Sequence, residues 1–373
     1  MIIYLLSDIE DSKQFEWLVN SNLNKKKLKI KFILINNSIT KKKLEKFLIE
    51  KNSLIKKYYY KNNFSFFKII LNLFFLIIKN KPIIIHCHSR KASIIGIFLS
   101  YILGVKQRIY TRHHGNENLK NYFKGYLIDK LISNLSTDIV SISNNTTNLL
   151  LNENKKNLSK IYEINHGLDF SNFDKLSVIN LENFRNKYKI DKNSFVVGVI
   201  SRFIDWKGIE FTILAFKKYY ENNKNAILVL ANANGPYRNV ILSYLEDIPK
   251  DNYIIIEFET DMISLYSLFD IFIHAPINAY CEAFGQVYIE SLALKIPSVF
   301  TKSGIGNDFL KHKKNCYIAE YKSQNSILDG ILFFNQIGNQ QKNEIIENGY
   351  KDVFKRFSLN EMLNKLETLY NNE

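Results

Sequence analysis

The part of the chain with the clearest potential for chemistry holds two glutamates eight residues apart, Glu282 and Glu290. They flank a predicted change from loop to helix, where Gly285 would let a ligand approach the backbone closely. The first amides of a helix have no partner within the helix, so they form a site for an anion such as a diphosphate. These amides belong to Phe284, Gly285, Gln286 and Val287. A carboxylate is a good acceptor for vicinal hydroxyls, so Glu282 could hold a sugar and Glu290 a ribose. A surface helix with solvated glutamates remains the alternative.

A second candidate element carries two cations, Arg202 and Lys207. They follow an apolar run that ends at Ile200 and precede a helix that we expect to begin near Gly208. Together they could neutralise a leaving diphosphate without a metal ion. The alternative is that both are solvated, as most lysines and arginines are.

Short apolar runs alternate with helix-length segments in both halves of the chain. Such alternation predicts an α/β protein with parallel sheets covered on both faces. The predicted strands are Ile2–Leu6, Ile30–Leu34, Pro82–His86, Gln107–Thr111, Asp138–Ser141 and Lys160–Ile164, then Phe195–Ile200, Ala226–Ala231, Tyr253–Ile256, Ile271–His274 and Ser298–Phe300. Lys351–Tyr370 reads as one amphipathic helix. We therefore expect domains at residues 1–168 and 169–350, and a C-terminal helical segment at 351–373.

These motifs resemble those of glycosyltransferase family 4, retaining enzymes with the GT-B fold of two Rossmann-like domains whose parallel sheets face a central cleft. Glu282 and Glu290 match the family's E-x7-E motif, and Arg202 and Lys207 match its phosphate-gripping cations. The first half matches less closely, at Ile85-His-Cys-His, at Thr111-Arg-His113 and at the hinge-like Asn165-His-Gly. The resemblance implies an acceptor-binding first domain, a nucleotide-sugar-binding second domain and a last helix that packs back on the first.

The resemblance also implies a reaction. A sugar would pass from a nucleotide-diphosphate donor to a glycan or lipid-linked acceptor, in bacterial polysaccharide or lipopolysaccharide synthesis. His113 would lie beside the transferred sugar as a positioning group, and no protein nucleophile, cofactor or metal would be needed. The sequence departs from the family after its first strand, where Ser7–Lys13 has no glycine.

The charge is uneven along the chain, whose formal net charge is +15. Residues 1–168 hold 28 Lys and Arg against 11 Asp and Glu, whereas residues 169–373 hold 23 against 25. A basic first half suggests an anionic surface, although solubility explains the charge equally well. We expect a membrane rather than nucleic acid, and a cytoplasmic protein peripheral on the inner face of the plasma membrane. The residues expected on the acceptor or membrane side are His88, Arg90, Lys56, Lys57 and Lys61.

The apolar segment Phe64–Ile78 is shorter than the ~20 residues that span a bilayer. A helix buried beside the sheet is favoured over a helix that dips into a membrane surface with flanking lysines, Lys79 and Lys81 among them. A zinc site of His86, His88 and His113 is disfavoured, because neutral histidines at strand ends need no metal.

Three rival functions stay open: a GT-B nucleotide-sugar epimerase, a phosphorylase, and a non-catalytic basic protein that binds membranes or nucleic acid. A phosphorylase would need a lysine that anchors pyridoxal phosphate, for which the sequence carries no specific signal. A non-catalytic binder would leave the glutamate motif unexplained. Three widely spaced cysteines suggest no disulfides and fit a reducing compartment.

Overall fold

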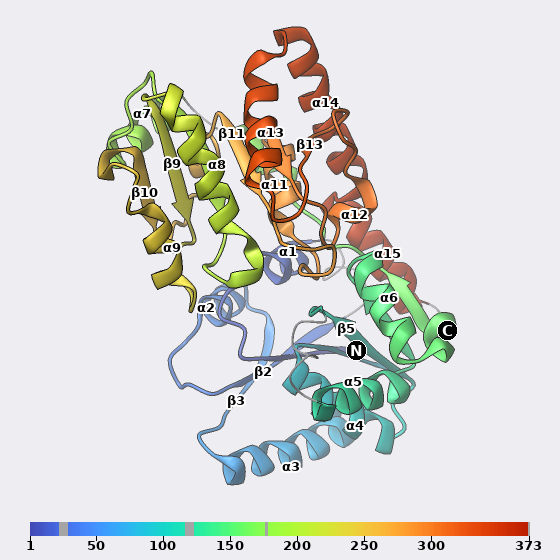
Figure 1. Cartoon of the computed structure of the whole chain (residues 1–373). Coiled ribbons are helices and arrows are strands. Elements are labelled where there is room, and N and C mark those ends of the chain that lie inside the picture. The colour runs from blue at the N-terminus through green and yellow to red at the C-terminus, as the bar shows by residue number, and fades with distance from the viewer. Residues whose placement is uncertain (22–28, 116–122, 176–177, 372–373) are drawn as a thin grey trace. The chain divides into compact units, whose positions relative to one another are not determined.

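The computed structural model describes residues 1–21, 29–115, 123–175 and 178–371, which form two compact units (Figure 1). The first unit comprises Met1–Asp169 and Leu359–Glu373, and the second comprises Phe170–Ser358. Each unit is built on one wholly parallel sheet with helices on both faces. The predicted fold class, α/β with two parallel-sheet domains, is confirmed.

The sheet of the first unit has seven strands in the order β3-β2-β1-β4-β5-β6-β7. Their bounds are β1 Ile2–Ser7, β2 Ile30–Asn36, β3 Leu54–Tyr59, β4 Ile84–His88, β5 Gln107–Arg112, β6 Asp138–Ser141 and β7 Ile161–Glu163. Sequence alone did not predict β3, because its two lysines and the tyrosines after them interrupt any apolar run. β4 begins two residues later than expected and extends to His88, so both of its histidines lie within the strand.

Two apolar cores cover the two faces of this sheet. Along β1, Ile2, Tyr4 and Leu6 face one core, and Ile3 and Leu5 face the other, as the alternation of side chains along a strand requires. The first core is completed by α1 Lys13–Asn20, α2 Lys43–Glu50 and α15 Leu359–Asn371. The second is completed by α3 Asn63–Asn80, α4 Arg90–Ile102, α5 Phe123–Leu135 and α6 Asn144–Glu153. A short 3₁₀ helix, η3 Lys155–Lys160, precedes β7.

The helix α3 contradicts the interpretation of Phe64–Ile78 as a buried helix. Only Ile69, Leu73 and Ile77 are buried along its 18 residues. Among the described residues, α3 alone is long and apolar enough to cross a membrane by length and composition, and only 17% of it is buried. The prediction failed because a helix apolar on all sides gives no sign of which side faces the core.

The C-terminal segment forms two helices where one, Lys351–Tyr370, was predicted. α14 Asn339–Arg356 belongs to the second unit, and α15 to the first. The break follows from Phe357, which is 2% exposed and packs its ring against Phe309 at 5.2 Å. Leu359 N then donates to Leu168 O at 2.9 Å, which fixes the start of α15 within the first unit.

The sheet of the second unit has six strands in the order β10-β9-β8-β11-β12-β13. They are β8 Phe195–Ile200, β9 Ala226–Ala231, β10 Tyr253–Ile256, β11 Ile271–His274, β12 Ser298–Phe300 and β13 Tyr317–Ile318. Its helices are η4 Phe170–Lys175, α7 Val178–Lys187, η5 Asp205–Lys207, α8 Ile209–Asn222, α9 Arg238–Leu245, η6 Lys250–Asn252, α10 Met262–Tyr266, α11 Gln286–Ala293, α12 Gly306–Phe309 and α13 Gln324–Gln336. Because β8, β11 and β12 are neighbours, the loops after them meet at one edge of the sheet.

Candidate functional site

The loops after β8 and β11 bring a lysine, a histidine and a glutamate together in the second unit. Lys207 Nζ lies 2.5 Å from Glu282 Oε1. His274, the last residue of β11, places Nε2 3.0 Å from the same oxygen. The side chains of Lys207, Glu282 and His274 are 13%, 9% and 1% exposed. The sequence predicted Lys207 and Glu282 as site residues but gave His274 no role beyond ending a strand.

The contacts among Lys207, Glu282 and His274 determine the protonation states of the glutamate and the histidine. Burial raises the pKa of Glu282, but the His274 hydrogen bond and the Lys207 ammonium outweigh burial and lower it to about 2. Burial lowers the pKa of His274, although the hydrogen bond and the charge of Glu282 raise it. At neutral pH the site therefore holds an ionised carboxylate and a neutral imidazole.

Two glycines allow the loops to meet this closely. Gly208 has a φ of +64°, and a Cβ there would lie 2.1 Å from Ala275 O. Because glycine has no Cβ, the η5 loop can approach the chain after β11, where Ile277 N donates to Trp206 O at 3.1 Å. Gly304, with a φ of +53°, packs in the same way against Glu282. The adjacent Ser303 Oγ accepts from Glu282 N at 2.9 Å, so the turn after β12 holds the Glu282 backbone in place.

The helix α11 begins close to this triplet. Gly285 is its N-cap with a φ of +88°, and Gln286 and Val287 follow as the first helical residues. Three of the four predicted amides thus lie at the helix N-terminus, the position that favours an anion. Phe284 comes one residue earlier and is 6% exposed, and its carbonyl accepts from Ile305 N at 2.8 Å.

Glu290 and Arg202 have contrasting surroundings. Glu290 accepts from Tyr266 Oη at 2.9 Å and from Gln286 Nε2 at 2.7 Å. Burial raises the pKa of Glu290, and these two hydrogen bonds oppose the rise. Glu290 is therefore not the solvated glutamate of the alternative interpretation. Arg202 is exposed, and within the described part of the chain no carboxylate lies within ion-pair distance of it.

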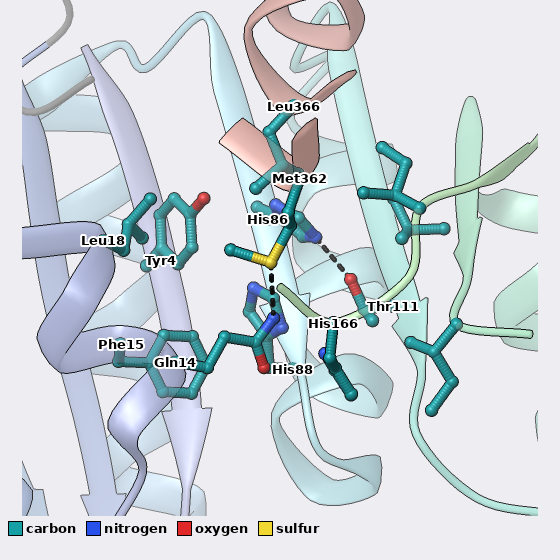
Figure 2. Close-up of a pocket in the computed structure, with 13 residues that line it drawn as sticks. Tyr4, Gln14, Phe15, Leu18, His86, His88, Thr111, His166, Met362 and Leu366 are labelled. Carbon is teal, nitrogen blue, oxygen red and sulfur yellow. Dashed lines mark hydrogen bonds between the residues drawn. The ribbon is translucent and has the colours of Figure 1, made fainter. Parts of the chain in front are cut away.

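Four histidines gather in the first unit near the carboxyl ends of β4 and β5. Figure 2 labels His86, His88 and His166. His88 Nδ1 lies 3.1 Å from His113 Nε2, and the ring of His113 stacks on His166 at 5.4 Å between centroids. His86 bonds Thr111 Oγ1 at 2.6 Å through Nε2 and Tyr370 Oη at 2.7 Å through Nδ1. A cavity of about 20 Å³ lies beside His86, His88 and His166, bounded also by α1 and α15.

These histidines are neutral at physiological pH. Burial lowers the pKa of His86 to about 3 and that of His166 to about 4. Burial also lowers the pKa values of His88 and His113 well below the usual range, and the charges of neighbouring histidines add to the effect. Within the described residues no group of three or more metal-ligating side chains forms a metal site. Cys87 faces the opposite core, as expected from strand alternation.

Sequence reasoning missed a buried charged cluster beneath His113. Arg112 is fully buried and pairs with Asp129 at 3.1 Å and with Glu153 at 3.0 Å. Asp129 also contacts His114 Nε2 at 3.1 Å and Arg90 Nε at 3.2 Å. Arg90, predicted on the acceptor side, therefore anchors helix α4 to α5. The available signal was Arg112 itself, directly after the predicted strand Gln107–Thr111, since a charge that is buried at a strand end requires partners.

The loop after β1, where the sequence lacks the expected glycine, keeps a glycine-like backbone. Asp8 has a φ of +54°, a conformation that glycine adopts most readily. Its carboxylate accepts from Tyr60 Oη at 2.8 Å and pairs with Lys91 at 3.2 Å. Ser7 Oγ lies 2.7 Å from Ser89 Oγ, which joins this loop to the start of α4.

The lysines expected on the membrane side lie on or just after the edge strand β3. Lys56 is exposed, and Lys61 is exposed ahead of α3. Lys57 pairs with the buried Glu45 of α2 at 2.9 Å. Lys57 therefore has a structural partner, whereas Lys56 and Lys61 present their charges to solvent.

Comparison with solved structures defines the fold. The chain superimposes on HepE of Anabaena, solved in complex with UDP and glucose, with a TM-score of 0.83 at 16% identity, covering 99% of both chains. The architecture is the GT-B fold of glycosyltransferases.

Sequence comparison points to a group within that fold. Residues 180–352 match the family model described as Glycosyl transferases group 1. The chain is 28% identical over 314 residues to the capsular polysaccharide biosynthesis glycosyltransferase CapM of Staphylococcus aureus, covering 83% of this chain and 81% of the relative. It is 20% identical over 313 residues to a UDP-Gal:alpha-D-GlcNAc-diphosphoundecaprenol alpha-1,3-galactosyltransferase of Escherichia coli, covering 81% and 79%. These matches support the superfamily of group 1 glycosyltransferases.

Proposed function

We propose that this protein is a retaining glycosyltransferase of family 4 type. It moves a sugar, a hexose by our expectation, from a nucleotide-diphosphate donor to a glycan or lipid-linked acceptor, in bacterial capsule, envelope polysaccharide or lipopolysaccharide synthesis. The observation that carries the proposal is the contact of Lys207 and Glu282 at 2.5 Å beside the N-terminus of α11. A cation, an ordered carboxylate and helix amides at one sheet edge suit a sugar diphosphate. The similarity to CapM supports the polysaccharide role.

The first chemical event is cleavage of the bond between the anomeric carbon and the donor phosphate oxygen. Positive charge develops on the sugar, and negative charge develops on the leaving diphosphate. Lys207, Arg202 and the amides of Gln286 and Val287 stabilise that negative charge, and groups already fixed in place do so most effectively. Arg202 is exposed before the donor binds, so its guanidinium is available to a phosphate.

The second event joins the acceptor oxygen to the anomeric carbon on the face that the diphosphate leaves. The acceptor hydroxyl transfers its proton to the departing phosphate oxygen, so no protein base or nucleophile is consumed. Glu282 is paired with Lys207 and accepts from His274. Its role is therefore to orient the sugar hydroxyls and Lys207.

His113 acts in this proposal as a neutral positioning group on the acceptor side. Burial keeps its pKa well below the usual range, so it cannot supply a positive charge at neutral pH. A neutral imidazole can still donate or accept one hydrogen bond to a sugar hydroxyl. The His88 ring at 3.1 Å fixes its orientation.

The test is incubation with a panel of uridine, guanosine and adenosine diphosphate sugars, with products followed by NMR. We expect release of the nucleoside diphosphate from one donor class and, with a suitable acceptor, a product of retained anomeric configuration. Lys207→Ala should abolish release, and Lys192→Ala, which removes an exposed lysine of the same unit, should not. An epimerised sugar still attached to its nucleotide would instead identify an epimerase. No turnover of any donor would favour the non-catalytic binder.

A further inference from the structure

The helix α3 carries apolar side chains on two opposite faces. One face packs into the first unit through Ile69, Leu73 and Ile77. The other points to solvent and is formed by five large side chains at helical spacing. They are Phe64, Phe67, Leu71, Phe75 and Ile78, exposed by 68%, 56%, 45%, 65% and 46%. At 100° per residue these five side chains form one narrow stripe opposite the buried one.

This apolar stripe continues onto the two neighbouring helices. Figure 1 shows α3, α4 and α5 on the same side of the first unit's sheet. The outer side chains are Ile94, Phe98, Tyr101 and Ile102 of α4 and Leu127, Ile128 and Leu131 of α5. An almost wholly apolar groove between the helices is lined by Ile70, Phe98 and Leu131, among others. We call this surface the α3–α5 face; monomeric soluble proteins rarely expose an apolar patch this extended.

The charge around the α3–α5 face has one sign. Residues 51–115 contain 12 Lys and Arg and no Asp or Glu, and the acidic residue of α5, Asp129, is buried. On and around α3, the exposed members are Lys61, Lys68, Lys79 and Lys81. Lys68 and Lys79 lie beside the outer stripe on the helix surface, and the ammonium of Lys68 sits 4.6 Å from the centre of the Phe64 ring.

We propose that the α3–α5 face rests on the surface of an anionic phospholipid bilayer, with the axis of α3 in the plane of the interface. The outer stripe enters the boundary between headgroups and acyl chains, and the flanking lysines contact anionic headgroups. The proposal stands without the transfer reaction, because binding is measured without turnover. If the transfer reaction is also correct, the face would hold the enzyme where lipid-linked acceptors lie, on the cytoplasmic side of the membrane.

A second copy of this chain fits the face less well. Symmetric dimers bring the same patch of both copies together. Here such pairing would bring two basic rims together with no acidic residue in residues 51–115 to compensate. Anionic lipid supplies the opposite charge. α3 does not span the bilayer, because Ile69, Leu73 and Ile77 fix its inner side in the unit's core.

The experiment is flotation of the full chain with vesicles of phosphatidylcholine alone or of an equimolar mixture with phosphatidylglycerol, at low and high salt. We expect binding to the mixed vesicles only, weakened by salt. The double variant Phe67→Ser, Phe75→Ser and the triple variant Lys68→Gln, Lys79→Gln, Lys81→Gln should each bind at least about tenfold less. Matched controls change exposed residues of the second unit: Phe258→Ser, and the triple variant Lys192→Gln, Lys224→Gln, Lys314→Gln.

Each other outcome overturns the proposal. Binding by the α3 variants equal to that of the wild type, or an equal loss in the controls, means that this face is not the contact. A lipid-free dimer in light scattering that becomes a monomer with Phe67→Ser, Phe75→Ser means that a second copy covers the face. Unchanged circular dichroism and thermal midpoint exclude misfolding. Donor turnover by the α3 variants, measured in parallel without lipid, should stay at the wild-type level. This measurement separates a failure of the membrane proposal from a failure of the proposed function.

Discussion

The histidine cluster of the first unit predicts a steep loss of stability under mild acid. His86 and His166 are held neutral, with pKa values of about 3 and about 4 in the folded protein. In the unfolded chain a histidine titrates near its ordinary value, about 6.5. Below that pH the histidines bind protons in the unfolded state but stay neutral in the folded state. The histidines therefore contribute their full stability above a pH of about 6.5, and this contribution is lost as the pH falls toward their pKa values in the folded protein.

The size of the effect follows from proton linkage. One histidine with these pKa values costs about 2 kcal/mol of stability between about pH 7 and about pH 5. His86 and His166 together cost about 4 kcal/mol, and the lowered pKa values of His88 and His113 act in the same direction. A domain is typically stable by about 5–15 kcal/mol, so the loss should be easy to measure. The Glu282 contribution lies elsewhere: it is present above the ordinary glutamate pKa and is lost as the pH falls toward about 2.

The assay is urea unfolding followed by tryptophan fluorescence across this pH range. The chain has two tryptophans, Trp17 in the first unit and Trp206 in the second. In a Trp206→Phe background the signal therefore reports the first unit alone. We expect the free energy of unfolding to fall by about 4 kcal/mol or more, and His86→Gln to reduce the slope by about one proton. His312→Asn should leave this slope unchanged, because His312 lies in the second unit, which Trp17 does not report.

Two results would refute this reasoning. A free energy of unfolding that is constant between about pH 7 and about pH 5 would mean that the cluster is charged or solvated in the folded protein. An equal change of slope in the His86 and His312 variants would mean that the pH dependence arises outside the cluster.

The proposed donor site supports two further predictions. Glu290→Gln should weaken donor binding by about 10- to 100-fold, the cost of losing a charged acceptor, with little effect on the acceptor; unchanged donor affinity in calorimetry would remove Glu290 from the site. Arg202→Ala and Lys207→Ala should each lower kcat as well as raise KM, because their partner is charge that grows during bond cleavage. Turnover should also survive EDTA, and complete loss restored by magnesium or manganese would show that these cations do not replace a metal.

Most strands were predictable because a parallel sheet buried on both faces requires continuous apolar runs. β8, for example, is Phe-Val-Val-Gly-Val-Ile and appears at its predicted bounds. The edge strand β3 was not predicted because its two consecutive lysines, Lys56 and Lys57, interrupt the apolar run; they are tolerated because only one edge of β3 is paired. β13 escaped because two residues carry no periodicity.

The candidate site was predictable only where chemistry is local in sequence. Glu282, Gly285 and Glu290 lie within one loop and one helix, so their spacing alone was enough to predict them as one candidate site. His274 could be recognised as a site residue only from the structure, in which the end of β11 lies beside the loop after β8. Arg112 meets Glu153 across 41 residues, a pairing set by the packing of α6 on the sheet. No spacing rule predicts such a contact, although the unfavourable burial of a lone arginine predicts that some partner exists.

Two of the helices that carry the outer apolar side chains, α4 and α5, also contribute to the charged cluster that holds His114. On α5, Asp129 points inward to Arg112 and His114, while Ile128 and Leu131 are exposed. At the start of α4, Arg90 contacts the same Asp129 at 3.2 Å. A force on the outer side of α5 therefore acts on a side chain that directly contacts His114, the neighbour of His113. Because the buried Arg112 pairs with both Asp129 and Glu153, displacing α5 would separate Arg112 from Asp129, which is strongly unfavourable for buried charges. The cluster thus links α4 and α5, two of the three helices of the α3–α5 face, to the end of β5 that precedes His113.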